Sequence, residues 1–164
     1  MYQTDPVKVE ILNAERTRVV MAAQESVHLD FMTRETLDRL QANDFVASWV
    51  SCDPEAVYFF VAVVGDEIVG VADVVKQIDK WLLVEPMHVH PKCQRHGVGR
   101  KLWDACLATA RRDGAAGLRV VALEQNPVAN AFYSKTLRLP AVGMETVTVG
   151  PQLFKAVRYE LAIG

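Results

Sequence analysis

The chain has 164 residues, 51% of them hydrophobic and 23% charged, and its formal net charge is −2. A chain of this length buries about 68–70% of the surface that it exposes when unfolded, so we expect one domain over residues 1–164. The slightly acidic balance argues against broad nucleic-acid binding, which usually needs a strongly basic face.

Cysteine usage and hydropathy indicate where the protein resides. The three cysteines show no CxxC spacing, which is typical of a reducing compartment without disulfides. The longest apolar run, at 56–64, holds nine residues, far fewer than the ~20 of a membrane span. The N-terminus lacks the basic and then apolar pattern of a signal peptide. We therefore expect a cytoplasmic protein that does not contact membranes.

The first half of the chain predicts strands on either side of a helical region. Residues 7–11 alternate apolar with polar, and 16–50 carry apolar residues at helical spacing. Two β-branched runs, at 57–64 and 67–75, are joined by Gly-Asp and predict a hairpin. Residues 81–90 predict another strand, and its interior Pro86 indicates a break or bulge because proline cannot donate to a ladder.

The second half predicts two helices among three strands. Residues 97–112 have helical periodicity, ended by Gly114, and 118–123 form a buried strand. Asn126-Pro127 predicts a helix start, with asparagine as N-cap and proline at the first helical position. Two strands at 146–163 complete the order β-α-α-β-β-β-α-β-α-β-β, a mixed α/β domain.

The stretch 88–102 concentrates side chains that carry chemistry, and a metal site is one interpretation. His88 and His90 share a face of the predicted strand, and Cys93 and His96 follow in the loop. No CxxC or HxxxH pair supports a metal site, however. The alternative for the two strand histidines is an ordinary polar strand end.

A phosphate cradle is the interpretation that we favour for the same stretch. A dinucleotide-binding fingerprint is excluded, because Gly97-Val98-Gly99 lacks the third glycine of GxGxxG. Small residues where a helix begins let backbone N–H groups approach an anion at the positive end of the helix dipole. Lys92, Arg95 and Arg100 add positive charge nearby.

Two motifs then resemble a known family. Gln94-Arg95-His96-Gly97-Val98-Gly99, after Val89-His90-Pro91, resembles the Q/R-x-x-G-x-G/A motif of the GNAT superfamily of acyl-CoA-dependent N-acetyltransferases. Residues 126–133, Asn-Pro-Val-Ala-Asn-Ala-Phe-Tyr, resemble its second signature, N-x-x-A-x-x-F-Y. The resemblance covers nearly the whole chain. It implies a GNAT-like mixed, mostly antiparallel central sheet flanked by about four helices, with a splayed fourth and fifth strand pair.

The resemblance implies acetyl-CoA as co-substrate and no metal. Amides from Arg95 to Gly99 would hold the CoA diphosphate, and the N–H of Val89 would stabilise the oxyanion. Asn126 would lie near the pantetheine as well as cap its helix. The expected CoA-binding residues are Met87, Val89, Gln94, Arg95, His96, Gly97, Val98, Gly99, Arg100, Asn126, Ala129 and Phe132.

The same resemblance suggests the acid and the base. Tyr133 aligns with the family's general acid, which protonates the leaving thiolate. Glu85 is the first candidate for the base and His88 the second, and the choice between them stays open. The chain departs from the family after Tyr133, because Ser134 to Pro140 lacks the usual Y-x-x-x-G-F turn. We expect no nucleophilic role for Cys93.

The leading hypothesis is therefore an N-acetyltransferase that uses direct attack by a primary amine, without an acyl-enzyme. One alternative is a non-catalytic acyl-CoA-binding sensor or interaction domain, which would have no need of an acid at Tyr133. Another is a metal-dependent binding domain built on the histidine cluster. The acceptor, a small-molecule or peptide amine, is not given by the sequence, and dimerisation is common in the family.

Overall fold

The computed structural model describes residues 6–11, 57–65, 67–84, 87–90, 93–149 and 152–163. The predicted helical segment 16–50 lies outside the described residues, as do Glu85 and Pro86. The chain divides into two compact units. Unit 1 comprises Met1–Val75 and Met87–Cys106, and unit 2 comprises Lys76–Pro86 and Leu107–Gly164. Each unit is described by itself.

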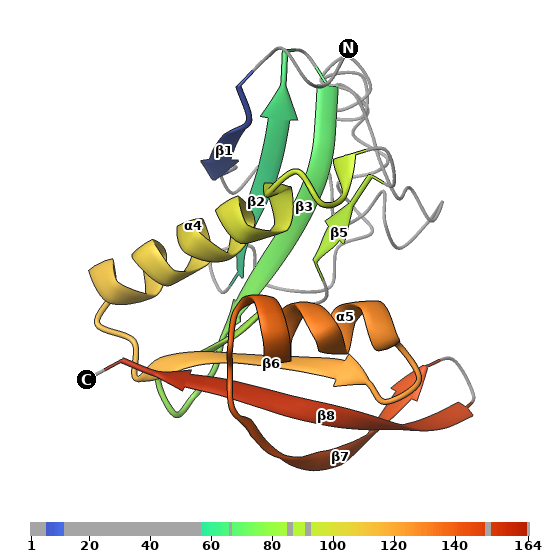
Figure 1. Cartoon of the computed structure of the whole chain (residues 1–164). Helices are drawn as coiled ribbons and strands as arrows, with labels where there is room; N and C mark the ends of the chain where they lie inside the picture. Colours follow the sequence, from blue (N-terminus) through green and yellow to red (C-terminus); the bar gives the residue numbers. More distant parts are fainter. Residues whose placement is uncertain are drawn as a thin grey trace, which may run out of the picture. The chain divides into compact units, whose positions relative to one another are not determined.

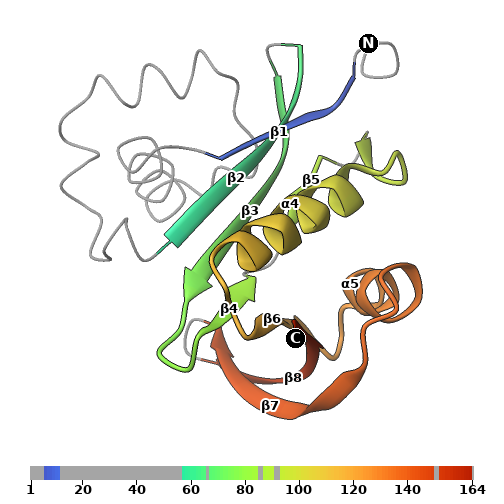
Figure 2. The ribbon, with the colours of Figure 1, turned by 90° about the vertical axis from the view of Figure 1, so that its left-hand side faces the viewer.

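Unit 1 contains an antiparallel sheet with the strand order β1-β2-β3-β5. Its strands are β1 Lys8–Ile11, β2 Val57–Val64, β3 Glu67–Lys76 and β5 His88–Val89. Figures 1 and 2 show β1, β2 and β3 side by side. Gly65, in the turn between β2 and β3, has a φ of +58°, a conformation that glycine adopts at little steric cost. The predicted hairpin is confirmed.

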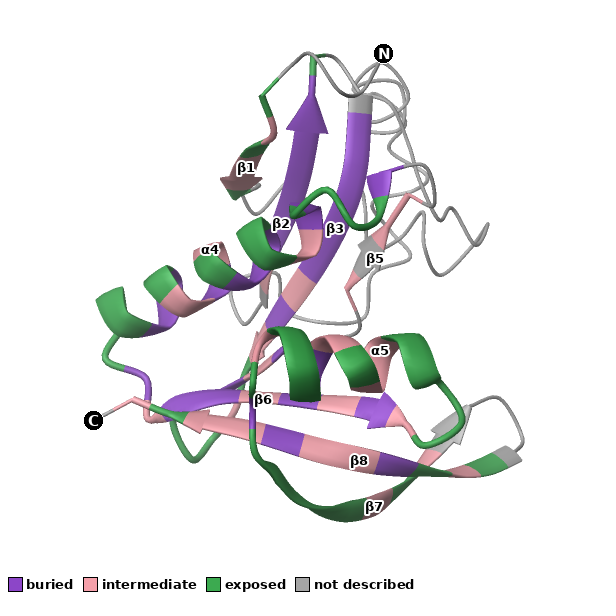
Figure 3. Cartoon of the chain, in the orientation of Figure 1, coloured by how far each residue is buried: buried purple, intermediate pink, exposed green. Residues whose placement is uncertain are grey.

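Strand β2 is buried from Phe59 to its end at Val64. Phe59 and Phe60 are fully buried, and Val61 to Val64 are at most 5% exposed. A strand that is covered on both faces has a continuous apolar sequence instead of an alternating one, which is the pattern of 57–64. Figure 3 shows this burial along β2 and much of β3.

Helix α4, Val98–Arg112, confirms the helix predicted at 97–112. One side of it is buried and the other exposed (Figure 3). Its end is fixed by Gly114, whose φ is +67°, and by the bond from the N–H of Ala115 to the carbonyl of Ala110 at 2.9 Å. No helix in the described ranges is long and apolar enough to cross a membrane. The buried residues of α4 are Val98, Leu102, Trp103, Cys106, Thr109 and Ala110.

Unit 2 contains a sheet with the order β4-β6-β8-β7. Its strands are β4 Trp81–Val84, β6 Gly117–Leu123, β7 Ala141–Val149 and β8 Gln152–Ala162. The β4–β6 pair is parallel, and the β6–β8 and β7–β8 pairs are antiparallel. Helix α5, Pro127–Ala131, and the π-helical turn η3, Phe132–Thr136, connect β6 to β7 and lie on one face of this sheet (Figures 1 and 2).

The structure corrects two predicted elements. The strand expected at 81–90 is two strands, since β4 ends at Val84 and β5 begins at His88. The first pairs with β6 and the second with β3, so the interruption that Pro86 indicated is confirmed. The penultimate strand begins at Ala141 and not at 146. A register shift between Ala141 and Gly143 interrupts the alternation of side chains by which the start of the strand would be recognised in the sequence. Of the about four helices expected, α4 and α5 lie in the described residues.

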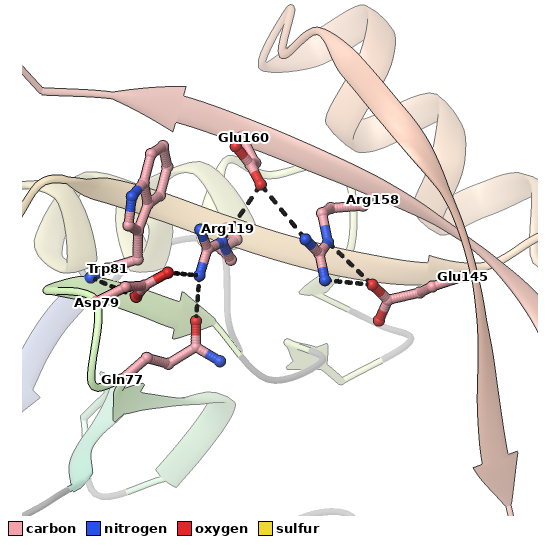
Figure 4. A network of polar contacts seen from close by, with 7 residues as sticks. All are labelled: Gln77, Asp79, Trp81, Arg119, Glu145, Arg158 and Glu160. Atoms are coloured by element: carbon pink, nitrogen blue, oxygen red, sulfur yellow. Dashed lines mark hydrogen bonds and ion pairs between the residues drawn. The ribbon is translucent and has the colours of Figure 1, made fainter.

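The face of the unit 2 sheet that faces away from α5 carries a polar network around Arg119 (Figure 4). Arg119 Nη1 donates to Asp79 Oδ2 and to Gln77 Oε1, both at 2.7 Å. Its Nε donates to Glu160 Oε1 at 3.3 Å, and the guanidinium carbon lies 4.5 Å from the centre of the Trp81 ring. The network therefore joins the turn before β4 to strands β6 and β8.

Arg158 extends this network to the edge strand. Its Nε donates to Glu145 Oε2 at 2.9 Å, and its Nη1 lies 3.7 Å from Glu160 Oε1. Glu160 is thus shared by two arginines (Figure 4). Charge-assisted hydrogen bonds of this kind are stronger than neutral ones, and here they bridge strands β6, β8 and β7.

The Asp79–Arg119 contact makes stability depend on pH. The hydrogen bond from Arg119 lowers the pKa of the Asp79 carboxyl below its ordinary value of 3.8. A carboxyl with a lowered pKa stabilises the fold above its unfolded-state pKa and loses that contribution as the pH falls through its folded pKa. The melting temperature of the wild type should therefore fall more steeply below about pH 4 than that of Asp79→Asn, by circular dichroism. In an Arg119→Met background, Asp79→Asn should change the pH profile less than in the wild type, because the bond from the Trp81 N–H to Asp79 Oδ1 at 3.1 Å is then the main contact left to the carboxylate. Equal pH profiles of the wild type and Asp79→Asn would contradict the expectation.

Gly117 lies where β6 passes close to its neighbours on both sides. A Cβ atom at this position would meet the Trp81 ring and would lie 2.5 Å from the carbonyl oxygen of Leu161. Real Cβ atoms do not approach backbone oxygens this closely, so the strands would have to move apart. At Gly143, in β7, nothing lies within 4 Å of an added Cβ.

Gly117→Ala should lower the free energy of unfolding by about 1–3 kcal/mol, the usual cost of overpacking. Gly143→Ala makes the same chemical change in open space and should stay within about 0.5 kcal/mol of the wild type. Urea unfolding of both variants measures the difference. Equal stabilities would show that the β4–β6–β8 spacing is not constrained at Gly117.

Candidate functional site

In strand β5, the N–H and C=O of one residue, Val89, point away from the partner strand β3. The N–H of His90 donates to the carbonyl of Val69 at 2.8 Å, and Val89 lies opposite Gly70. Hydrogen-bonded and non-hydrogen-bonded pairs alternate in an antiparallel ladder, so the N–H and C=O of Val89 point away from β3. The carbonyl oxygen of Val89 accepts a hydrogen bond from Gln94 Nε2 at 3.1 Å.

The loop between β5 and α4 has an alternating backbone. Arg95 has a φ of +64° and Gly97 a φ of +80°, whereas His96 between them is not left-handed. Such alternation turns successive N–H groups toward one side and forms a concavity that suits an anion. His96 Nδ1 lies 2.8 Å from the carbonyl oxygen of Gln94, which only accepts, so Nδ1 carries a proton.

The first turn of α4 follows this loop directly. Residues 94–97 and Arg100 are exposed, Val98 is buried, and Gly99 is intermediate. No acidic side chain lies in the first turn of α4, and the N-terminal end of the helix carries a partial positive charge. Lys101 instead donates from Nζ to the carbonyl of Val7 at 3.3 Å. Unit 1 therefore places the predicted residues from Gln94 to Arg100 in one loop and the helix start that follows it, and their contact with an anion stays a prediction.

Both candidates for the general base lie beyond what the structure describes. Glu85 falls outside the described residues, and only the backbone of His88 is described. In the parts of the chain that are described, no three His, Cys, Asp or Glu side chains gather as metal ligands. Two members of the histidine-cysteine cluster lie in different environments. The side chain of His96 is exposed to solvent, whereas that of Cys93 is buried, with 3% of it exposed.

The second motif forms a capped helix in unit 2. The Oδ1 of Asn126 accepts a hydrogen bond from the N–H of Ala129 at 3.1 Å, and Pro127 occupies the first helical position. The predicted N-cap is confirmed. Ala129 and Phe132 are half-buried, so their expected contact with CoA stays a prediction.

Tyr133 lies on the π-helical turn η3 and packs against two other aromatic rings. Its side chain is 4% exposed, and its ring centre lies 5.4 Å from that of Phe132 and 5.7 Å from that of Tyr159. The N–H of Leu137 donates to the carbonyl of Phe132 at 2.9 Å, the bond that defines a π-turn. Tyr133 belongs to unit 2 and the loop 94–97 to unit 1.

The departure from the family pattern after Tyr133 has a backbone explanation. Arg138 has a φ of +55°, a left-handed conformation that a glycine would adopt without strain. The N–H of Leu139 then donates to the carbonyl of Tyr133 at 2.9 Å and closes the turn. In this chain an arginine therefore adopts the left-handed conformation at the end of the helical turn that glycine commonly adopts.

The sequence did not single out two residues next to Tyr133. Tyr159 Oη donates to Asn130 Oδ1 at 2.7 Å, although the two residues lie 29 positions apart. Asn130 stands inside the second motif at a position that the motif leaves free, and Tyr159 stands in an apparently ordinary strand. A polar residue on the half-buried face of a short helix is the signal that could have identified Asn130.

Cys106 cannot serve as a thiolate at neutral pH. Burial, with the charge of Asp73 adding to it, raises the pKa of the Cys106 thiol to about 12. Neither Cys93 nor Cys106 forms a disulfide, and both are buried. A buried thiol that stays protonated is a packing residue and not a nucleophile.

Comparison with known proteins identifies the family of this chain and supports its fold. The model of the acetyltransferase (GNAT) family matches residues 23–137. Among curated proteins, none matches this chain. Several hundred solved chains do match it, three of which are described next.

Nourseothricin acetyltransferase is 25% identical, with a TM-score of 0.59, over 69% of this chain and 69% of that one. A protein from Bacillus anthracis str. Ames, assigned as a streptothricin acetyltransferase and bound to acetyl coenzyme A, is 18% identical, with a TM-score of 0.59. The match covers 66% of this chain and 63% of that one, less than two thirds of its length. The ribosomal-protein-S18-alanine N-acetyltransferase of Escherichia coli is 16% identical over 96% of this chain and 94% of that one, with a TM-score of 0.63. The last two likenesses are evidence for the fold.

Proposed function

Because this chain belongs to the GNAT family of acetyltransferases, we propose that it transfers the acetyl group of acetyl-CoA to a primary amine. The amine nitrogen attacks the thioester carbon directly, the C–N bond forms, the C–S bond breaks, and CoA leaves as a thiol. The acceptor is a small-molecule or peptide amine. The N-acetyltransferase named for the Escherichia coli protein and the acetyl-CoA bound to the Bacillus anthracis protein support this proposal.

The alternating loop before α4 is the observation that carries the proposal. Arg95 and Gly97 are left-handed, their segment is exposed, and the N-terminus of a 15-residue helix follows at once. These features fit the diphosphate of CoA, which carries negative charge and accepts hydrogen bonds from backbone N–H groups. We assign that binding to Gln94 through Gly99, with Arg100 adding formal charge.

Val89 fits the role of the oxyanion donor. Its N–H points away from β3, and the bond from Gln94 to its carbonyl restrains the orientation of the next peptide group. A preorganised N–H donor aimed at developing negative charge stabilises the transition state of acyl transfer. Gln94 would therefore contribute both to diphosphate binding, as the first residue of the loop, and to oxyanion stabilisation, through its hydrogen bond to the Val89 carbonyl.

Two proton transfers complete the reaction. Removing the proton of an alkylamine with a pKa near ~10.4 costs on the order of 4.6 kcal/mol at pH 7, and we keep Glu85 and His88 as the candidates for that base. Tyr133 gives its hydroxyl proton to the leaving sulfur. With a tyrosine pKa near ~10 and a thiol pKa near ~8.5, that transfer is uphill by about 2 kcal/mol.

Gly97→Ala tests the cradle against a matched control. An alanine in the left-handed region costs about 1–2 kcal/mol, and no atom lies within 4 Å of its Cβ at either Gly97 or Gly114. Gly97→Ala should weaken CoA binding about tenfold or more, because the loop changes its conformation. Gly114→Ala, at the other end of α4, should lose similar stability and keep its CoA affinity.

Titration calorimetry of the EDTA-treated proteins with CoA and acetyl-CoA measures both affinities. Equal affinities in the two variants would remove the loop from the binding site. If the folded wild type bound neither ligand, the acetyltransferase proposal would be wrong.

Tyr133→Phe tests the acid. The ring and its packing remain, so CoA affinity should stay within about twofold, whereas kcat should fall about 100-fold or more if the hydroxyl proton is transferred. The measurement is thiol release from acetyl-CoA with an amine found by an acetylation screen. An unchanged kcat would exclude Tyr133 from the mechanism, and CoA binding without turnover on any amine would favour the sensor alternative.

A further inference from the structure

Asn130 is the centre of a side-chain network within unit 2. Its Nδ2 donates to the carbonyl oxygens of Leu123 and Asn126, both at 2.8 Å, and its Oδ1 accepts from Tyr159 Oη at 2.7 Å. Exchanging the amide nitrogen and oxygen would place acceptors against acceptors, so the orientation of this side chain is fixed. One amide thus joins the end of β6, the cap of α5 and strand β8.

Tyr159 lies between Asn130 and Tyr133. It is 4% exposed, and its ring centre is 5.7 Å from that of Tyr133, with the ring planes at 41°. Burial raises the pKa of the Tyr159 hydroxyl, so at neutral pH this hydroxyl stays protonated and donates to Asn130. Tyr133 therefore packs against a ring whose own position is fixed at its far end.

Tyr133 needs such support because of the backbone that carries it. The turn η3 spans only five residues and has π-type bonding, and α5 before it also spans five. Helical segments this short have little stability of their own, so tertiary contacts decide where their side chains point. Tyr159 supplies one of those contacts to the tyrosine that the proposed reaction requires.

We propose that Asn130 and Tyr159 are positioning residues that hold Tyr133 in its reactive orientation. The contacts run from the carbonyls of Leu123 and Asn126, through the Asn130 amide and the Tyr159 hydroxyl, to the Tyr133 ring. This inference rests on the proposed function, since it supports the same acid. Neither residue exchanges a proton with the substrate in this role.

Tyr159→Phe removes the hydroxyl that reaches Asn130 and keeps the ring. We expect kcat to fall about tenfold, with the KM for acetyl-CoA within about twofold, because misorientation affects the reacting geometry more than binding. The basic limb of the kcat–pH profile, which reports the acid, should move. In a Tyr133→Phe background, Tyr159→Phe should have no further effect, because the residue to be positioned has lost its proton donor.

Fluorine NMR reports on Tyr133 without any acceptor amine. The chain contains four tyrosines, so incorporation of 3-fluorotyrosine gives a simple spectrum in which Tyr133→Phe and Tyr159→Phe assign two lines. Asn130→Ala should shift or broaden the Tyr133 line, since Tyr159 loses its anchor. If Asn130→Ala does not fold, Tyr159→Phe provides the same readout.

Two variants separate positioning from general loss of structure. Ser134→Ala removes a 2.7 Å hydrogen bond to the backbone carbonyl of Asn130, but leaves the Asn130 side chain bonded. Arg119→Met weakens the same sheet from the face away from α5. Both should keep the Tyr133 line and the kcat–pH profile of the wild type.

The outcomes distinguish this inference from the proposed function. If Tyr133→Phe retains kcat, the acid assignment fails, and the positioning role fails with it. If Tyr133→Phe abolishes turnover but Tyr159→Phe leaves kcat unchanged, or lowers it equally in both backgrounds, only the positioning role is overturned. A Tyr133 line that Asn130→Ala leaves unmoved would also overturn it.

Discussion

The hydrogen-bonding register of β5 against β3 is the constraint on which the unit 1 site depends. Val89 points its N–H and C=O away from β3 because His90 uses its own N–H on Val69. A register shift of one residue would exchange the two orientations and turn the N–H and C=O of Val89 toward β3. The bond from Gln94 to Val89 then ties the start of the loop 94–97 to that register, so the conformation of the loop and the register of β5 depend on each other.

In unit 2 the constraint is different, because the very short helical segments need tertiary contacts to hold their conformation. Helix α5 and the turn η3 together span ten residues, from Pro127 to Thr136. Asn126 satisfies a free N–H at the start, Asn130 anchors the middle to two strands, and Arg138 adopts a left-handed conformation at the end. Side-chain hydrogen bonds provide here the order that helix length provides in α4.

The sequence predicted features with local causes and missed those with distant ones. The Asn126 cap, the Gly114 helix end and the hairpin all arise from residues close together in the chain, and all three are confirmed. The Asn130–Tyr159 bond joins residues 29 positions apart, and no periodicity marks it. Strand β7 was predicted too short because its first residues are exposed and interrupted by a register shift, which removes the alternation that identifies a strand.

That register shift has a consequence for the behaviour of the protein in concentrated solution. Strand β7 is the last strand of the unit 2 sheet, and Val142 and Met144 on it are 51% and 54% exposed. A straight apolar edge strand offers a template on which other chains add and aggregate. The irregularity between Ala141 and Gly143 bends this edge and interrupts the row of N–H and C=O groups that an incoming strand would need. We therefore expect the same irregularity that shortened the predicted strand to limit the addition of other chains at this edge.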